Sequence, residues 1–315
     1  MLLFTIAEIA ALIAGFFVAA ELVADGTDKI EPLMGQGMAG GVVLGLLGSL
    51  PETIFVIIAV LAGSPGVAIG SAIGGNIILF TLGLGAVAIA YNIKWREPLR
   101  MKEDYHVELY FLGASSVGII LLILYGSLNL WSGLLLSAPY VVYILYRYRK
   151  ARRMMRRSVR DPAARKLLLR GLAMMSAGIV MVTVLSGYFV QAINQLAGAL
   201  GIAAIWLALV ISPIAADLDE NISGYRLAVR SRGGGSTAIV SYMGSKLQNN
   251  TLLLGLIGII AVSPVSTGKS TPELLIVASI NVLAIAFVVR RRFSYAMGVT
   301  MIVLYFVSVA AAFTL

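Results

Sequence analysis

The 315-residue sequence has no cysteine and a single histidine, His106. Without cysteine there are no disulfides, thiolate metal sites or thiol nucleophiles, and one histidine cannot assemble a zinc or copper site. Charged side chains are also scarce, at 12% of the residues against about 25% in an ordinary soluble domain. So little charge excludes a soluble enzyme, a nucleic-acid-binding module and a disordered tail.

What the sequence has in abundance is apolar surface. Hydrophobic residues make up 59% of the chain, with 33 glycines in addition, and the mean hydropathy is +0.94. A soluble fold of this size lacks the interior to bury so much apolar surface. The sequence therefore predicts an all-α integral membrane protein, with the lipid bilayer as the partner of its apolar faces.

Ten apolar segments are long enough to cross the hydrocarbon core as helices, which takes about 20 residues each. The connections between them are short, so no soluble domain is inserted. The expected spans cover residues 2–24, 36–62, 67–92, 107–126, 129–147, 167–192, 197–224, 236–262, 272–289 and 293–314.

The basic residues orient these spans. The segment from Arg147 to Arg170 holds 11 of the 24 lysines and arginines, so it is expected in the cytoplasm, which puts the N-terminus outside. With ten spans, 22 of the basic residues fall on that one side, Lys269 falls on the other, and Lys246 lies within a span. The net charge of +9 therefore indicates topology, in a cell membrane, rather than binding to nucleic acid.

The basic segment also divides the chain into two halves. We expect an N-terminal five-helix repeat over residues 1–146, a basic cytoplasmic loop over 147–170 and a C-terminal five-helix repeat over 171–315. Five spans in each half give the halves opposite orientations, as in an inverted-repeat transporter. Residues 71–85 match residues 241–255 at six of fifteen positions, with a constant offset of 170. The segments Gly48–Glu52 and Ala216–Glu220 also both carry a leucine two residues before a glutamate.

Five charged residues lie deep within the expected spans, where an ionisable side chain costs several kcal/mol and indicates a functional site. They are Glu52 in span two, Asp217, Asp219 and Glu220 in span seven, and Lys246 in span eight.

Helical spacing gathers further polar side chains around these charges. Single faces carry Ser49 with Glu52, Asp217 with Glu220, and Ser245 with Gln248 and Asn249. Pro51 and Pro213 remove backbone hydrogen bonds, and a helix broken there frees carbonyl oxygens near mid-membrane. Such an oxygen-rich cluster suits a hard cation such as Ca²⁺ or Mg²⁺. A carboxylate in a low dielectric also takes up protons more readily, so it can exchange a metal ion for a proton.

These motifs resemble those of the cation/calcium exchanger superfamily, whose members carry two such repeats on ten or eleven helices. The segment Gly48–Glu52 is similar to the GTSLPE motif of the sodium/calcium branch, and Gly74–Ile77 is similar to part of its GSNIFN or GSNIFD motif. In the second half, Pro213–Asn221 resembles the PIVGNAAEH motif of the proton/calcium branch, and Gly244–Gln248 resembles its GSSLQ motif.

The resemblance implies that Glu52 and Glu220 are the two central carboxylates, which bind Ca²⁺ and exchange it for protons. Gly75 stands where the sodium/calcium branch has a Na⁺-binding serine, which argues against a three-sodium mechanism. Asp219 and Lys246 are additional charges that modulate the site. Lys246 either pairs with an aspartate in a buried salt bridge or acts as a built-in cation, in an ion position or in proton exchange. The further ligands implied are Ser49, Asn76, Asp217, Gln248 and Asn249.

We therefore expect a secondary antiporter that exchanges Ca²⁺, or a related divalent cation such as Mg²⁺, for H⁺ by alternating access. Such a protein is not an enzyme and needs no cofactor or obligatory protein partner. Na⁺/Ca²⁺ exchange is the alternative, followed by a passive cation channel with an acidic pore. An intramembrane aspartyl protease would need aspartates on two helices, and only span seven carries them.

Overall fold

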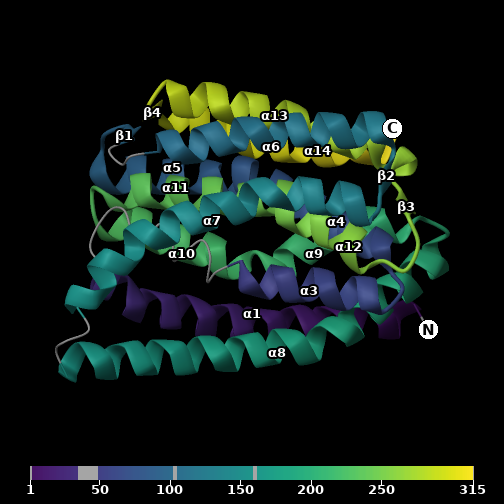
Figure 1. The fold of residues 1–315 in the computed structure, drawn as a ribbon, viewed down its shortest axis with the longest axis horizontal. Helices are drawn as coiled ribbons and strands as arrows, with labels where there is room; N and C mark the ends of the chain where they lie inside the picture. The colour runs from purple at the N-terminus through teal and green to yellow at the C-terminus, as the bar shows by residue number, and fades with distance from the viewer. Residues whose placement is uncertain (1, 35–48, 102–104, 159–161, 315) are drawn as a thin grey trace.

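The computed structural model describes residues 2–34, 49–101, 105–158 and 162–314, and nearly all of them are helical. The helices run roughly side by side along the long direction of the molecule (Figure 1). The first half contains α1 (Leu2–Met34), α3 (Leu50–Leu61), α4 (Pro65–Ile78), the π-helical turn η1 (Leu79–Gly83), α5 (Leu84–Trp95), α6 (His106–Tyr125) and α7 (Leu130–Ser158). The second half contains α8 (Pro162–Leu200), α9 (Ala204–Ala216), α10 (Leu218–Arg230), α11 (Gly234–Gln248), the π-helical turn η2 (Asn249–Leu253), α12 (Leu254–Ile260), the 3₁₀ turn η3 (Gly268–Ser270), α13 (Thr271–Val289) and α14 (Tyr295–Thr314).

Six of the described helices are long and apolar enough to cross a membrane, judged by length and composition. Two shorter apolar helices, α3 and α9, accompany them. The start of the second expected span, residues 36–48, lies outside the described residues. The six are Leu2–Ile30, Pro65–Trp95, His106–Tyr125, Pro162–Leu200, Thr271–Val289 and Tyr295–Ala312.

The basic segment expected as a loop over 147–170 is mostly helical. Helix α7 continues to Ser158, and α8 begins at Pro162. Arginine and lysine are good helix formers, so nothing in residues 147–158 stops α7. Proline is favoured at the first position of a helix and disfavours helical structure in the residue before it, which fits the start of α8 at Pro162. With 39 residues, α8 is about 58 Å long, well beyond the ~30 Å of a hydrocarbon core. Its basic end therefore has room to extend past the membrane.

Three of the expected spans are interrupted within their length. Span seven divides at Asp217, which separates α9 from α10, and Pro213 lies within α9 four residues earlier. Spans three and eight each contain a π-helical turn, η1 and η2, and these turns are 170 residues apart. Such turns interrupt the regular hydrogen-bond ladder and occur frequently at functional sites.

Two short antiparallel strand pairs hold opposite ends of the bundle (Figure 1). At one end, β1 (Leu99–Arg100) pairs with β4 (Arg292–Phe293). At the other end, β2 (Ser127–Leu128) pairs with β3 (Val265–Ser266). Each pair therefore joins a connection of the first half to a connection of the second half.

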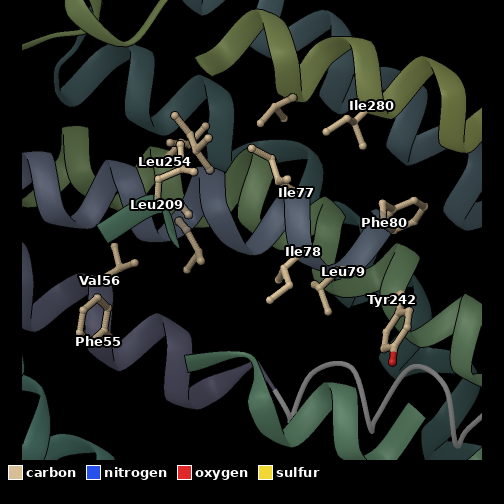
Figure 2. Close-up of a cluster of buried hydrophobic side chains, with 14 of the residues drawn as sticks. Phe55, Val56, Ile77, Ile78, Leu79, Phe80, Leu209, Tyr242, Leu254 and Ile280 are labelled. Atoms are coloured by element: carbon tan, nitrogen blue, oxygen red, sulfur yellow. The ribbon is translucent and has the colours of Figure 1, made fainter. Parts of the chain in front are cut away.

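Small residues allow the helices of the two halves to pack closely. Helix α1 lies along α8, and α4 lies along α9. A Cβ atom on Gly26 would lie 2.6 Å from the Gly171 carbonyl oxygen, and one on Gly70 would lie 2.5 Å from the Ile205 carbonyl oxygen. Hydrophobic side chains from α3, α4, η1, α9, α11, α12 and α13 fill the middle of the bundle (Figure 2). This packing fixes the interrupted helices against one another.

Candidate cation site

Two glutamates occupy equivalent positions in the interrupted helices. Glu52 is the third residue of α3, and Glu220 is the third residue of α10. Both are buried, and so is Asp217 at the break before α10. Pro51 at the start of α3 fits the first turn of a helix, where its missing N–H leaves no bond unmade. The local sequence therefore starts both helices inside the bundle, with a carboxylate in the first turn of each.

Glu52 and Asp217 converge at Gly75 on α4. A Cβ atom built on Gly75 would lie 2.6 Å from Glu52 Oε1, 2.8 Å from Asp217 Oδ2 and 2.7 Å from Asn249 Nδ2. All three atoms lie within 2.8 Å of one point, so any two of them are within twice that distance of each other. A glycine at this position leaves that point free, and three helices deliver polar groups to it.

The oxygens at this point suit a hard cation. Within the described part of the chain, all four carboxylate oxygens of Glu52 and Asp217 are buried without a hydrogen-bond donor. The amide atoms of Asn249 also have no partner there. Buried polar atoms are normally paired, so an unpaired carboxylate pair implies that a cation or protons belong with it. Ca²⁺ is bound by such oxygens at 2.3–2.6 Å with loose geometry, and the same carboxyls can instead hold protons.

Glu220, the third carboxylate, accepts a hydrogen bond from the second half of the chain. Ser245 on α11 donates from its hydroxyl to Glu220 Oε1 over 2.6 Å. Among the described side chains, no group of three or more histidines, aspartates or glutamates is arranged to hold a metal ion. The structure thus brings together Glu52, Asp217 and Asn249 from the expected ligand set, and holds Glu220 on Ser245.

Ser49 and Gln248, both expected as cation ligands, form hydrogen bonds with each other. The Ser49 hydroxyl donates to Gln248 Oε1 at 2.5 Å, and Gln248 Nε2 donates to Thr53 Oγ1 at 2.6 Å and to the Ser49 carbonyl at 3.1 Å. Tyr140 on α7 donates a further hydrogen bond to Gln248 Oε1. Thr53 and Tyr140 were not expected from the sequence. A tyrosine beside Pro139, in the middle of an apolar span, is the only sequence signal for the second of them.

Lys246 and Asn76 meet across the two halves. The Lys246 ammonium donates to the Asn76 backbone carbonyl at 2.9 Å and lies 4.8 Å from the centre of the Phe80 ring. The Asn76 side chain donates to the Ala72 carbonyl at 3.0 Å, and its own Oδ1 is buried without a partner among the described residues. No described carboxylate, Asp217 included, forms a salt bridge with Lys246. The side chain of Asp219 lies outside the described residues.

The two π-helical turns carry the same side-chain hydrogen bond. Thr81 Oγ1 donates to the Ile77 carbonyl, and Thr251 Oγ1 donates to the Leu247 carbonyl, each at 2.5 Å. Donor and acceptor are related by the offset of 170 in both cases. The interruption beside the site is therefore built in the same way in both halves.

Comparison with known proteins identifies the family. A family model described as sodium/calcium exchanger protein matches residues 4–149 and 170–314. The chain belongs to this family. The family resemblance of the motifs is thereby confirmed, and with six apolar helices the chain is an integral membrane protein. A search of curated proteins with this sequence found no match.

Solved structures share the fold at low sequence identity. An H⁺/Ca²⁺ exchanger, CAX, is 18% identical with a TM-score of 0.74, over 97% of this chain and 80% of that chain. The sodium-calcium exchanger NCX_Mj, soaked with 2.5 mM Na⁺ and 0.1 mM Sr²⁺, is 17% identical with a TM-score of 0.71, over 98% of this chain and 99% of that one. The same exchanger soaked with zero Na⁺ and Ca²⁺ has a TM-score of 0.66 at 17% identity, over 99% of both chains.

Proposed function

We propose that this protein is a secondary antiporter that exchanges Ca²⁺, or a related divalent cation, for H⁺ by alternating access. The observation that carries the proposal is the buried pair of carboxylates, Glu52 and Asp217, which converge with Asn249 on one point beside Gly75. Their unpartnered oxygens supply the ligands that a hard divalent cation takes. Membership of the sodium/calcium exchanger protein family supports ion exchange rather than catalysis.

On this proposal the protein has ten spans in two inverted five-helix repeats, and alternating access moves one repeat against the other. Paired features at the offset of 170 support this arrangement: the turns η1 and η2, and the threonine hydrogen bonds within them. The strand pairs support it too, because exchanging the halves would convert the pair β1–β4 into the pair β3–β2 at the opposite end (Figure 1). On this proposal the basic segment 147–170 is cytoplasmic, the N-terminus is outside, and the protein resides in a cell membrane.

Proton coupling follows from the chemistry of facing carboxyls. Two acidic groups that lie close together in a low dielectric cannot both stay ionised without a counter-charge. A divalent cation supplies that charge in one state, and bound protons replace it in the other. Gly75 offers no hydroxyl ligand for a Na⁺ ion at this point.

A flux assay in vesicles tests the proposal. We expect Ca²⁺ uptake when a pH gradient is imposed, and we expect Glu52→Gln and Glu220→Gln each to abolish it. Glu97→Gln is the matched control, because Glu97 is 43% exposed and its contacts, an ion pair with Arg232 and a hydrogen bond from the Tyr91 hydroxyl, lie at the surface end of α5, outside the candidate site. Uptake that needs a Na⁺ gradient and ignores pH would indicate Na⁺/Ca²⁺ exchange. Uptake that persists without either gradient would indicate a channel.

A further inference from the structure

Lys246 places a basic amino group inside the bundle, where its side chain is fully buried. Its ammonium contacts the Asn76 carbonyl at 2.9 Å and the face of Phe80 at 4.8 Å. Carbonyl oxygens and aromatic faces are neutral groups that attract cations, and both kinds bind small monovalent cations and ammonium ions in proteins. Figure 2 shows the Phe80 ring on η1 among the buried side chains. The two contacts therefore form a cation position that the chain itself fills.

This position involves the residue next to Gly75 on α4, and no described carboxylate pairs with the lysine there. Asn76 follows Gly75, the glycine at which Glu52 and Asp217 converge. No described carboxylate lies within the 4.0 Å of Lys246 that defines a salt bridge. A lysine with a purely structural role in apolar surroundings would be expected to form such a pair, because an unpaired buried charge is costly. Here Lys246 donates instead to the backbone carbonyl of Asn76, the residue that follows Gly75 on α4.

The repeat shows how Lys246 comes to lie there. The offset of 170 makes Lys246 the counterpart of Asn76, so the two residues occupy equivalent positions on α11 and α4. The lysine side chain crosses between the halves and ends on the backbone of its own counterpart. Only one of the two equivalent positions carries a charge, so the exchange site is electrically asymmetric.

Charge balance gives this asymmetry a function. Among the described residues, the buried carboxylates of the candidate site are Glu52, Asp217 and Glu220, and Lys246 is the buried basic residue on α11, the helix that packs against α10. Three carboxylates and one ammonium give the site a net charge of −2, which one divalent cation neutralises. In a low dielectric, such neutrality is strongly favoured. Without the lysine, a bound divalent cation would leave one negative charge, and a monovalent cation would be needed as well.

We propose that the Lys246 ammonium is a tethered monovalent cation of the exchange site, which fills the position between the Asn76 carbonyl and the Phe80 ring and keeps transported monovalent cations out of it. The proposal deepens the proposed function and rests on it for the meaning of the divalent site. It predicts that wild-type protein binds its divalent cation without help from Na⁺, K⁺ or Li⁺. Neutralising the lysine opens the position to one of these ions.

Thermal unfolding of the purified full-length protein tests this directly. Each of Li⁺, Na⁺ and K⁺ is compared at equal ionic strength with choline, whose methyl groups keep its nitrogen from approaching a carbonyl oxygen to 2.9 Å as the lysine does. A ligand that binds only the folded state raises the unfolding temperature. We expect no difference between the salts for wild type or Lys246→Arg. For Lys246→Met or Lys246→Gln, we expect at least one small cation to raise the unfolding temperature by about 2 °C or more.

Transport gives a second measurement. The initial rate of Ca²⁺ uptake by Lys246→Met should differ at least threefold between the small cation that stabilises it and choline, whereas wild type should not distinguish them. Folded neutral variants that respond equally to all four cations would overturn the proposal, and would leave Lys246 as a helix-to-helix link. If neither neutral variant folds, the unfolding temperature of wild type is the deciding measurement. A rise caused specifically by one small cation would refute the idea that the lysine fills the position, and equal unfolding temperatures in all four salts would support it.

Failure of the proposed function can be told apart from failure of this inference. A wild-type protein that moves no Ca²⁺ in vesicles would refute the proposed exchange. The unfolding measurement needs no transport, so it would still show whether removing the lysine creates a binding position for a monovalent cation.

Discussion

Gly75→Ala is the sharpest test of the candidate cation site, because it adds one carbon atom at the point of convergence. That carbon would lie 2.6–2.8 Å from Glu52 Oε1, Asn249 Nδ2 and Asp217 Oδ2. A carbon atom normally stays about 3.3 Å or more from an oxygen, so these groups must retreat by roughly 0.5–0.7 Å. A binding site tolerates displacements of only about 0.5 Å in its ligands. We therefore expect divalent affinity to fall at least about tenfold, a loss of ~1.4 kcal/mol.

Two measurements on the same preparation check this prediction. Ca²⁺ should raise the unfolding temperature of wild type but not of Gly75→Ala, and uptake into vesicles should fall in parallel. Gly187→Ala is the matched control, because Gly187 is also helical, on α8, and a Cβ atom there meets nothing within 4 Å. The control should bind and transport Ca²⁺ as wild type does. A folded Gly75→Ala variant with wild-type Ca²⁺ affinity would refute the convergence of ligands at this point.

Three further predictions concern contacts between helices of the bundle. Glu108→Gln or Arg147→Met breaks a buried ion pair, and each should lower the free energy of unfolding by about 3–5 kcal/mol. The double variant should lose less than the sum of the two single losses, and additive losses in thermal unfolding would contradict the pairing. Tyr140→Phe removes one hydrogen bond to Gln248, so it should lower the free energy of unfolding by about 0.5–1.5 kcal/mol while Ca²⁺ uptake persists. Abolished uptake in a stable variant would make Tyr140 part of the site. Gly171→Ala places a carbon 2.7 Å from a carbonyl oxygen of α1, so it should lower the unfolding temperature; an unchanged value would show that α1 and α8 separate without cost.

The fold class was readable from the sequence because lipid imposes simple rules. Apolar length predicted the helices, and the helices of the structure overlap the expected spans wherever residues are described. The repeat was readable for a similar reason. Identities at an offset of 170, such as Thr81 with Thr251, reflect a local backbone feature that both halves need, and both hydroxyls make the same hydrogen bond.

The arrangement within the site was only partly readable. Spacing along one helix predicts which side chains share a face, but it gives no distance to a residue on another helix. Gln248 was expected as a ligand, yet Ser49, Thr53 and Tyr140 from two other helices use its amide group. The helical course of residues 147–158 was missed because a charge-rich segment was interpreted as a loop, although its residues favour helix.

On the proposed function, the placement of the two glutamates bears on how a buried site both binds and releases a divalent cation. Glu52 and Glu220 are each the third residue of a helix that starts inside the bundle, so each lies in the first turn, near the positive end of a helix dipole. That field lowers the free energy of the ionised carboxylate when no cation is bound, and it repels a cation that arrives. Both effects weaken divalent binding relative to a site made of carboxylates alone, and Lys246 adds a repulsion of the same sign. An exchanger needs such a balance, because a cation held too strongly by three buried carboxylates would not leave on the other side of the membrane.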